Sequence, residues 1–183
     1  MKRIFVLAAA VCLLSIAAFA QTASYSGTWK LDASRSTLSG PMRIESMTWT
    51  VTQTDKQITV ESVTKRLPPN DAPPAGGGGR GGMGRGGFGG GDGTNTFPLD
   101  GKEIKSEVDG PMGKMPVAYK GTREADGSLK LSTARTFNGP NGEMTVTTDE
   151  AWSLSADGKT LTVKRSSTTP RGEQTSTFVF TKS

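Results

Sequence analysis

The feature that most constrains the fold is an alternation of polar and apolar residues, which begins after residue 21 and is punctuated by Asp-Gly and Asn-Gly pairs. Alternation with a period of two is typical of strands that bury one face, and such pairs are typical of tight turns between antiparallel strands. No apolar stripe with helical spacing accompanies this pattern. The sequence therefore predicts an all-β chain.

The alternating runs number about ten, and they follow one another as an antiparallel up-and-down meander. They are expected near residues 25–31, 43–53, 56–65, 95–99, 102–108, 115–124, 128–137, 144–155, 159–167 and 174–182. A sheet of this size buries a single apolar face by curling into a barrel. A two-sheet sandwich is the alternative.

The turn residues predict which residues pair across each hairpin. A two-residue type I′ turn at Asp157-Gly158 pairs Leu154 with Leu161, Trp152 with Val163, and Glu150 with Arg165. Near Asp126-Gly127 an odd-length loop with a glycine bulge is expected, because only this loop pairs Arg123 with Leu129 and keeps the apolar residues on one face.

Three further hairpins are predicted in the same way. A turn at Thr54-Asp55 sets Val51 beside Ile58 and Trp49 beside Val60, a turn at Asp100-Gly101 sets Phe97 beside Ile104, and a wider end near residues 170–172 pairs Val163 with Phe180 and Arg165 with Phe178. On these registers the outward residues are polar, for example Lys130, Ser132 and Thr136. A lipid-facing band must be apolar. A water-soluble barrel that does not insert into a membrane is expected.

The N-terminus has the pattern of a secretory signal. Lys2 and Arg3 precede an apolar run, and Ala18-Phe19-Ala20 supplies small residues of the kind found before a cleavage site. We expect a signal peptide at residues 1–20, a single domain at residues 21–183, and a secreted or periplasmic location. An uncleaved membrane anchor is the alternative, although the run is short for a bilayer span.

Residues 67–94 interrupt the predicted barrel with a segment that is first rich in proline and then rich in glycine. Almost nothing apolar in this segment can offset the entropy lost on ordering, so a disordered loop between the third and fourth strands is expected. Arg80 and Arg85 lie in RGG repeats, which bind RNA when many occur together. Two such arginines in an exported protein predict no nucleic-acid partner.

The residue inventory argues against catalysis. The sequence has no histidine, and its one cysteine, Cys12, lies in the predicted signal. The mature chain therefore lacks the usual general base, the thiol nucleophile and the imidazole metal ligand. We expect no catalytic residues, no metal, no cofactor and no enzyme activity; the sequence does not indicate an oligomeric state.

The stretch Ser26-Gly27-Thr28-Trp29-Lys30 on the first expected strand resembles the Gly-x-Trp opening of lipocalins and related calycin barrels. The resemblance implies that Gly27 permits a bend at the barrel entry and that Trp29 plugs the closed end beneath a basic residue from late in the chain. The chain departs from lipocalins in lacking a C-terminal helix, a cysteine pair and a Thr-Asp-Tyr motif. It lacks the helical lid of the fatty-acid-binding branch as well.

The predicted ligand-binding residues face the barrel interior on the expected registers. They are Arg165, Glu150, Trp152, Arg135, Tyr119 and Phe178. An arginine held between a carboxylate and an aromatic ring can bind a ligand carboxylate, and the alternative is a purely structural ion pair. Arg123, Ser62, Ser106, Thr133 and Thr148 are also expected to face inward. Two functions follow: an exported barrel that binds a small hydrophobic or amphipathic molecule, or an envelope structural or interaction module whose barrel is filled by its own side chains.

Overall fold

A computed structural model describes residues 24–39, 44–67, 92–110, 113–139, 142–169 and 172–183. The strands are β1 (Gly27–Leu31), β2 (Ile44–Gln53), β3 (Gln57–Arg66), β4 (Gly93–Pro98), β5 (Asp100–Gly110), β6 (Gly113–Arg123), β7 (Leu129–Gly139), β8 (Gly142–Leu154), β9 (Thr160–Thr169) and β10 (Gly172–Lys182). Every strand end lies within two residues of its predicted position, so the all-β prediction is confirmed. No helix in the described ranges is long and apolar enough to cross a bilayer.

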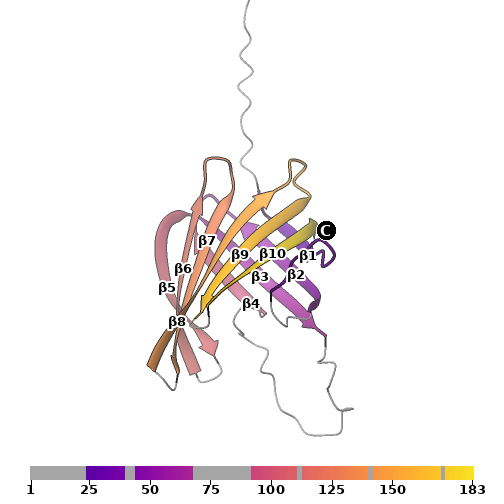
Figure 1. The fold of residues 1–183 in the computed structure, drawn as a ribbon. Helices are drawn as coiled ribbons and strands as arrows, with labels where there is room; N and C mark the ends of the chain where they lie inside the picture. Colours follow the sequence, from indigo (N-terminus) through magenta and orange to yellow (C-terminus); the bar gives the residue numbers. More distant parts are fainter. Residues whose placement is uncertain (1–23, 40–43, 68–91, 111–112, 140–141, 170–171) are drawn as a thin grey trace, which may run out of the picture.

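The strands form one antiparallel sheet in the order β4-β3-β2-β1-β10-β9-β8-β7-β6-β5, which curls into a nearly closed barrel (Figure 1). The first and last strands pair with each other, as Leu31 with Phe180, so β1 and β10 lie in the middle of the sheet. The opening lies between β4 and β5. The predicted pairing of Phe97 with Ile104 is therefore wrong, and Phe97 pairs with Ile58 of β3.

β5 follows β4 directly along the chain, but the two strands then diverge as the edges of the sheet. Side chains of β4 and β6 close part of the space that is left. Tyr119 of β6 donates a hydrogen bond of 2.8 Å to Asn95 of β4, and its ring lies edge-on to Phe97 at 5.2 Å. A Cβ on Gly121 would lie 2.4 Å from the carbonyl oxygen of Pro98, so only glycine admits this approach. Ser106 lies opposite the buried Val117, which agrees with its predicted inward direction, but it is exposed because β5 is an edge of the sheet.

The predicted registers of the β6–β7 and β8–β9 hairpins are confirmed residue for residue. Leu154 pairs with Leu161, Glu150 with Arg165, and Arg123 with Leu129. Gly127 has a φ of 83° in the odd-length loop between β6 and β7, which is the conformation that a glycine bulge requires.

Two other hairpin predictions are wrong by two residues, which preserves the face of every side chain. The β2–β3 turn closes between Thr54 and Gln57, so Val51 pairs with Val60 rather than Ile58. In the β9–β10 hairpin Val163 pairs with Phe178, and Arg165 pairs with Ser176 rather than Phe178.

The β8–β9 turn has the predicted pairing but a different backbone. Gly158 donates a hydrogen bond of 2.8 Å to the carbonyl of Ser155, and Gly158 has a φ of 66°. No residue other than glycine has a positive φ in the part of the chain that is described, so Asp157 does not adopt the type I′ conformation. The pairing survives because a longer loop around a type I turn has the same register.

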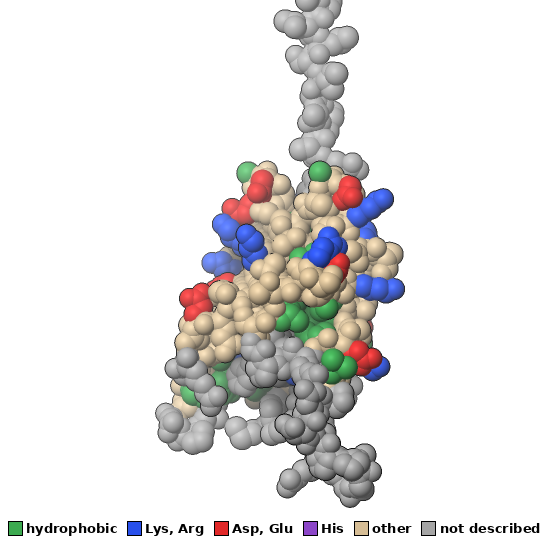
Figure 2. Space-filling view, turned by 45° about the vertical axis from the view of Figure 1, so that its right-hand side comes forward, with side chains coloured by type: hydrophobic (Ala, Val, Ile, Leu, Met, Phe, Trp, Pro, Cys, Tyr) green, Lys and Arg blue, Asp and Glu red, His purple; other side chains and the backbone are tan. Residues whose placement is uncertain are grey.

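The hydrophobic core lies in the barrel interior, toward the end that carries the β2–β3, β6–β7 and β8–β9 turns. Trp29, Trp49 and Trp152 are at most 3% exposed, which confirms their prediction as core residues. The outer surface of the barrel is mainly polar, and Lys, Arg, Asp and Glu side chains are scattered over the face that Figure 2 shows. The predicted signal peptide and residues 68–91 of the predicted disordered loop lie outside the described residues; Gly93 and Thr94, expected in that loop, belong to β4.

Candidate ligand-binding site

The inward residues of β6 to β10 form cross-strand rows whose polarity changes along the barrel. One row is apolar and contains Leu129, Trp152, Val163 and Phe178. The next contains Leu131, Glu150, Arg165 and Ser176, and the one after it contains Tyr119, Thr133, Thr148 and Ser167. Arg135 follows between Val117 and Val146. We call the apolar row and the core beyond it the aromatic half, and the later rows the polar half.

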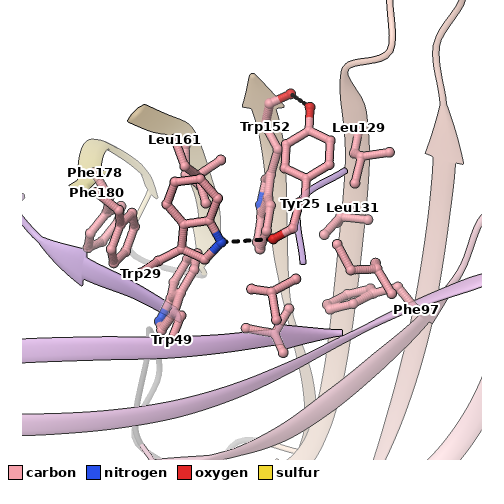
Figure 3. Close-up of a cluster of buried hydrophobic side chains, with 14 of the residues drawn as sticks. Tyr25, Trp29, Trp49, Phe97, Leu129, Leu131, Trp152, Leu161, Phe178 and Phe180 are labelled. Atoms are coloured by element: carbon pink, nitrogen blue, oxygen red, sulfur yellow. Dashed lines mark hydrogen bonds between the residues drawn. The ribbon is translucent and has the colours of Figure 1, made fainter. Parts of the chain in front are cut away.

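Tyr25 and Trp29 hold the aromatic half together (Figure 3). The indole Nε1 of Trp29 donates a hydrogen bond of 2.8 Å to the Tyr25 carbonyl, and the Tyr25 hydroxyl donates to the Trp152 carbonyl at 3.1 Å. Trp49 stacks on Trp152 with ring centroids 5.1 Å apart and lies 4.3 Å from Phe180. Burial raises the pKa of Tyr25 to about 12, with the charge of Asp126 adding to the effect.

Glu150 and Arg165 form an ion pair at the boundary between the two halves. The Arg165 Nη2 lies 2.6 Å and its Nε 2.7 Å from Oε1 of Glu150, and the two side chains are only 10% and 12% exposed. The other carboxylate oxygen accepts a hydrogen bond of 2.8 Å from Nε1 of Trp152. Glu150 therefore has both oxygens satisfied, and the pair carries no net charge.

Phe178 covers the guanidinium of Arg165. The Cζ atom of Arg165 lies 4.6 Å from the centroid of the Phe178 ring, although Phe178 stands two residues along β10 from its predicted position. The Nη1 atom of Arg165 is buried and has no hydrogen-bond partner among the described residues. The structure thus brings together four of the predicted site residues, Glu150, Trp152, Arg165 and Phe178.

The two remaining predicted residues, Tyr119 and Arg135, form a second group. Burial raises the pKa of Tyr119, and the adjacent Arg135 guanidinium opposes that rise. Among the described residues Arg135 has no ion-pair partner, and its Nε is buried without an acceptor. A half-buried positive charge without a counter-ion is costly, so Arg135 is the residue of this site that has the most to gain from an acceptor.

Other buried donors also lack partners within the described residues. They are Nε1 of Trp49, Oγ of Ser62 and Nε of Arg123. Arg123 is the last residue of β6, next to the β6–β7 turn. Its positive charge lowers the pKa of Tyr25 and so opposes the effect of burial. The predicted inward positions of Ser62, Thr133 and Thr148 are confirmed by their pairing, and Thr148 exchanges a hydrogen bond of 3.1 Å with Ser167.

Asn95 is a site residue that the sequence did not reveal. It precedes Phe97 by two residues on β4 and thus shares its inward face. No turn in the sequence predicts contact of β4 with β6, because the two strands meet through side chains and not through a hydrogen-bonded turn. No group of three or more Asp, Glu, His or Cys suited to a metal occurs in the ranges that the structure describes.

A groove of about 670 Å³ lies on the other side of the same sheet. Its lining residues from β6 to β10 alternate with the buried ones, so they face outward; they are mainly Lys120, Thr122, Lys130, Ser132, Asp149, Ala151, Lys164, Ser166, Thr175 and Thr177. The lining also includes Leu131, Glu150, Arg165 and Ser176 of the inward row, so the groove borders the interior site across the sheet.

Trp29 and Lys182 lie as the Gly-x-Trp resemblance implied for the tryptophan and a late basic residue. Trp29 is fully buried, and the Nζ of Lys182, the penultimate residue, lies 5.2 Å from the centroid of its ring. Gly27 has a φ of 135°, and a Cβ there would lie 2.7 Å from Cε of Lys182. Gly27 therefore provides both the bend and the space for the lysine.

No family model and no curated protein matches the sequence. One solved structure that is similar is the zebrafish ileal bile acid-binding protein in complex with cholic acid. The match has a TM-score of 0.47 and 14% sequence identity, and it covers 87% of this chain and 98% of that chain. These values do not support a conclusion about family, so the chain is assigned to none.

Proposed function

We propose that the barrel binds a small amphipathic molecule with one anionic group, and that Arg135 is the main contact of that anion. The observation that carries it is the set of buried donors without acceptors among the described residues, above all Nε of Arg135, a residue that has no ion-pair partner there. Buried hydrogen-bonding groups in proteins are nearly always paired, and every member of this set can donate. A ligand that supplies acceptor oxygens would satisfy them.

The rest of the interior suits the apolar part of such a ligand. Trp152 and Phe178 lie in the row next to the Glu150–Arg165 pair, so an apolar body can contact aromatic rings while its anion stays in the polar half. Arg165 is already neutralised by Glu150, and its Nη1 offers a hydrogen bond rather than a net charge. The proposal is thus of a binding protein rather than an enzyme.

Two further parts of the proposal rest on the N-terminal region. The Gly27, Trp29 and Lys182 arrangement supports a lipocalin-like plug at the closed end. The charged and apolar pattern of residues 1–20 supports export to the periplasm or the medium. N-terminal sequencing of the protein isolated from culture medium and from periplasmic extract tests both the cleavage after Ala20 and the location.

The ligand proposal is tested by calorimetric titration with dodecanoate and with dodecanol, both below their micellar concentrations. We expect the wild-type protein to bind dodecanoate more tightly than dodecanol. Arg135→Gln should weaken dodecanoate binding by about tenfold or more, because a hydrogen bond to a charged group contributes roughly 1.5–3 kcal/mol. The same variant should leave dodecanol binding within about twofold.

Lys56→Gln is the matched control, since Lys56 is an exposed cation in the β2–β3 turn. It removes the same unit of charge without touching the interior. Equal affinity for dodecanoate in the wild type and in Arg135→Gln, or no binding of dodecanoate at all, would contradict the proposal.

The second candidate is a non-catalytic envelope structural or interaction module with a filled barrel. It is favoured by the continuous cluster of buried side chains that fills the aromatic half, and by the position of the 670 Å³ groove on the outer face. If this candidate is right, Arg135→Leu should stabilise the protein, because an unpaired charge is removed from the core. The variant should then show no loss of ligand affinity.

A further inference from the structure

We propose that the outer groove on β6 to β10 binds an extended acidic polysaccharide, such as a uronate polymer. This inference does not rest on the interior site, because ten of the fourteen lining residues point away from the barrel interior, and only Leu131, Glu150, Arg165 and Ser176 belong to an inward row. The groove crosses five strands, so its occupant is expected to lie across the strands as a chain rather than as a compact molecule.

Two adjacent cross-strand rows give the groove its chemistry. One row contains Lys120, Ser132, Asp149 and Ser166 on β6 to β9. The neighbouring row contains Lys130 of β7 and Lys164 of β9. Because neighbouring strands are about 4.8 Å apart, the Cα atoms of Lys120 and Lys164 are separated by roughly 15 Å. An extended chain with anionic groups at intervals can contact both lysines without drawing their side chains together.

The charges of the groove are only partly used within the protein. Lys130 pairs with Glu124 at 3.3 Å, whereas Lys120 and Lys164 form no ion pair with the residues that are described. The side chain of Asp149 is exposed between them, and carboxylates accept hydrogen bonds. A polymer that carries both carboxylates and hydroxyl groups matches this sequence of cation, acceptor and cation better than an anion without hydroxyl groups.

The lining also argues against a nucleic acid. None of the residues that line the groove is aromatic, so it has no ring on which a base can stack. At the rim Ser166 donates a hydrogen bond of 2.5 Å to Glu173, and this second carboxylate disfavours the dense phosphates of a nucleic acid. The same carboxylate can accept a hydrogen bond from a sugar hydroxyl.

The test is fluorescence anisotropy of labelled polygalacturonate oligomers with the purified protein at low ionic strength. We expect saturable binding that weakens as salt is added, because screening reduces attraction between exposed charges. Lys120→Ser combined with Lys164→Ser should lower the affinity by about tenfold, which corresponds to about 1.4 kcal/mol for the two lysines. Saturating dodecanoate should leave this binding unchanged, so the interior and outer sites are tested separately.

Lys30→Ser combined with Lys56→Ser is the matched control, because both lysines are exposed and lie outside the groove. This control should keep the affinity within about twofold. An equal loss in the control would show attraction to the overall positive charge and would overturn the proposal. It would also be overturned by absent binding, by equal binding of neutral dextran, or by tighter binding of polyphosphate or single-stranded DNA.

Discussion

The two halves of the barrel interior are built on the same strands but satisfy their buried groups differently. In the aromatic half the Tyr25 hydroxyl and the Trp29 indole have backbone acceptors, and the rings pack against one another. Both halves also retain buried donors without acceptors in the described structure: Nε1 of Trp49 and Nε of Arg123 on the aromatic side, and Nε of Arg135 and Nη1 of Arg165 on the polar side. The difference is that the aromatic half is packed by its own rings, whereas the polar half presents the Arg135 cation that the proposed ligand would contact.

The division runs across individual strands. On β8 Trp152 belongs to the apolar row, Glu150 to the ion pair, and Thr148 to a row of hydroxyl groups. Since inward residues alternate with outward ones, each step of two residues along a strand moves one row along the barrel. A short stretch of sequence therefore encodes both the core and the candidate site.

The largest expected effect tests the aromatic half. Trp29→Ala removes a fully buried indole and its hydrogen bond to Tyr25, and we expect the free energy of unfolding to fall by about 4 kcal/mol. Urea denaturation followed by circular dichroism measures this loss. A loss below about 1 kcal/mol would mean that Trp29 does not anchor the core.

The second effect tests the boundary between the halves. Glu150→Leu leaves the nearly buried Arg165 without its counter-ion and should cost about 3 kcal/mol of unfolding free energy. Adding Arg165→Leu should restore most of that stability, because the unpaired charge is then removed. Urea denaturation of both variants gives the comparison; a double variant as unstable as Glu150→Leu alone would show that packing, not charge, explains the loss.

A third effect is a pH dependence that belongs to the aromatic half. Burial raises the pKa of Tyr25 from 10.0 to about 12, so the folded state holds this proton more tightly than the unfolded chain. The resulting stability is fully present below pH 10 and is lost as the pH rises toward 12, with a total of about 3 kcal/mol. Urea denaturation between pH 9 and pH 12 should show a shallower decline for Tyr25→Phe than for the wild type. Identical slopes would contradict the burial of this hydroxyl as the cause.

The smallest effect tests the polar half. Thr148→Val removes a hydroxyl that is bonded only to Ser167, and we expect a change of less than about 1 kcal/mol in the free energy of unfolding. Thermal denaturation of Thr148→Val and of Ser167→Ala, which removes the other hydroxyl of the pair, measures this change. A loss comparable to that of Trp29→Ala would erase the distinction between the halves.

Much of the fold could be predicted because turns and alternation determine the strand faces. The pairing of Glu150 with Arg165 followed directly from the Asp157-Gly158 turn. The errors of two residues at Val51 and Arg165 arose where turn residues fit two positions, and such errors do not change which face a side chain occupies. The inward direction of all six candidate site residues therefore survived them.

The contacts across the opening could not be predicted in the same way. Asn95 reaches Tyr119 because β4 approaches β6 through side chains, and no turn residue encodes that approach. The outer groove was also missed, since the lysines on β6 and β9 are far apart in the sequence and look like ordinary solvated residues. Their proximity follows from the pairing of four strands.

The most direct test of an anion site in the polar half is a crystal structure with dodecanoate brominated at its terminal carbon, located by anomalous scattering. We predict that the carboxylate contacts Arg135 and that the bromine lies toward Trp152 and Phe178 inside the barrel. Bromine density confined to the outer groove, or an interior filled by protein side chains with no ligand density, would contradict this prediction.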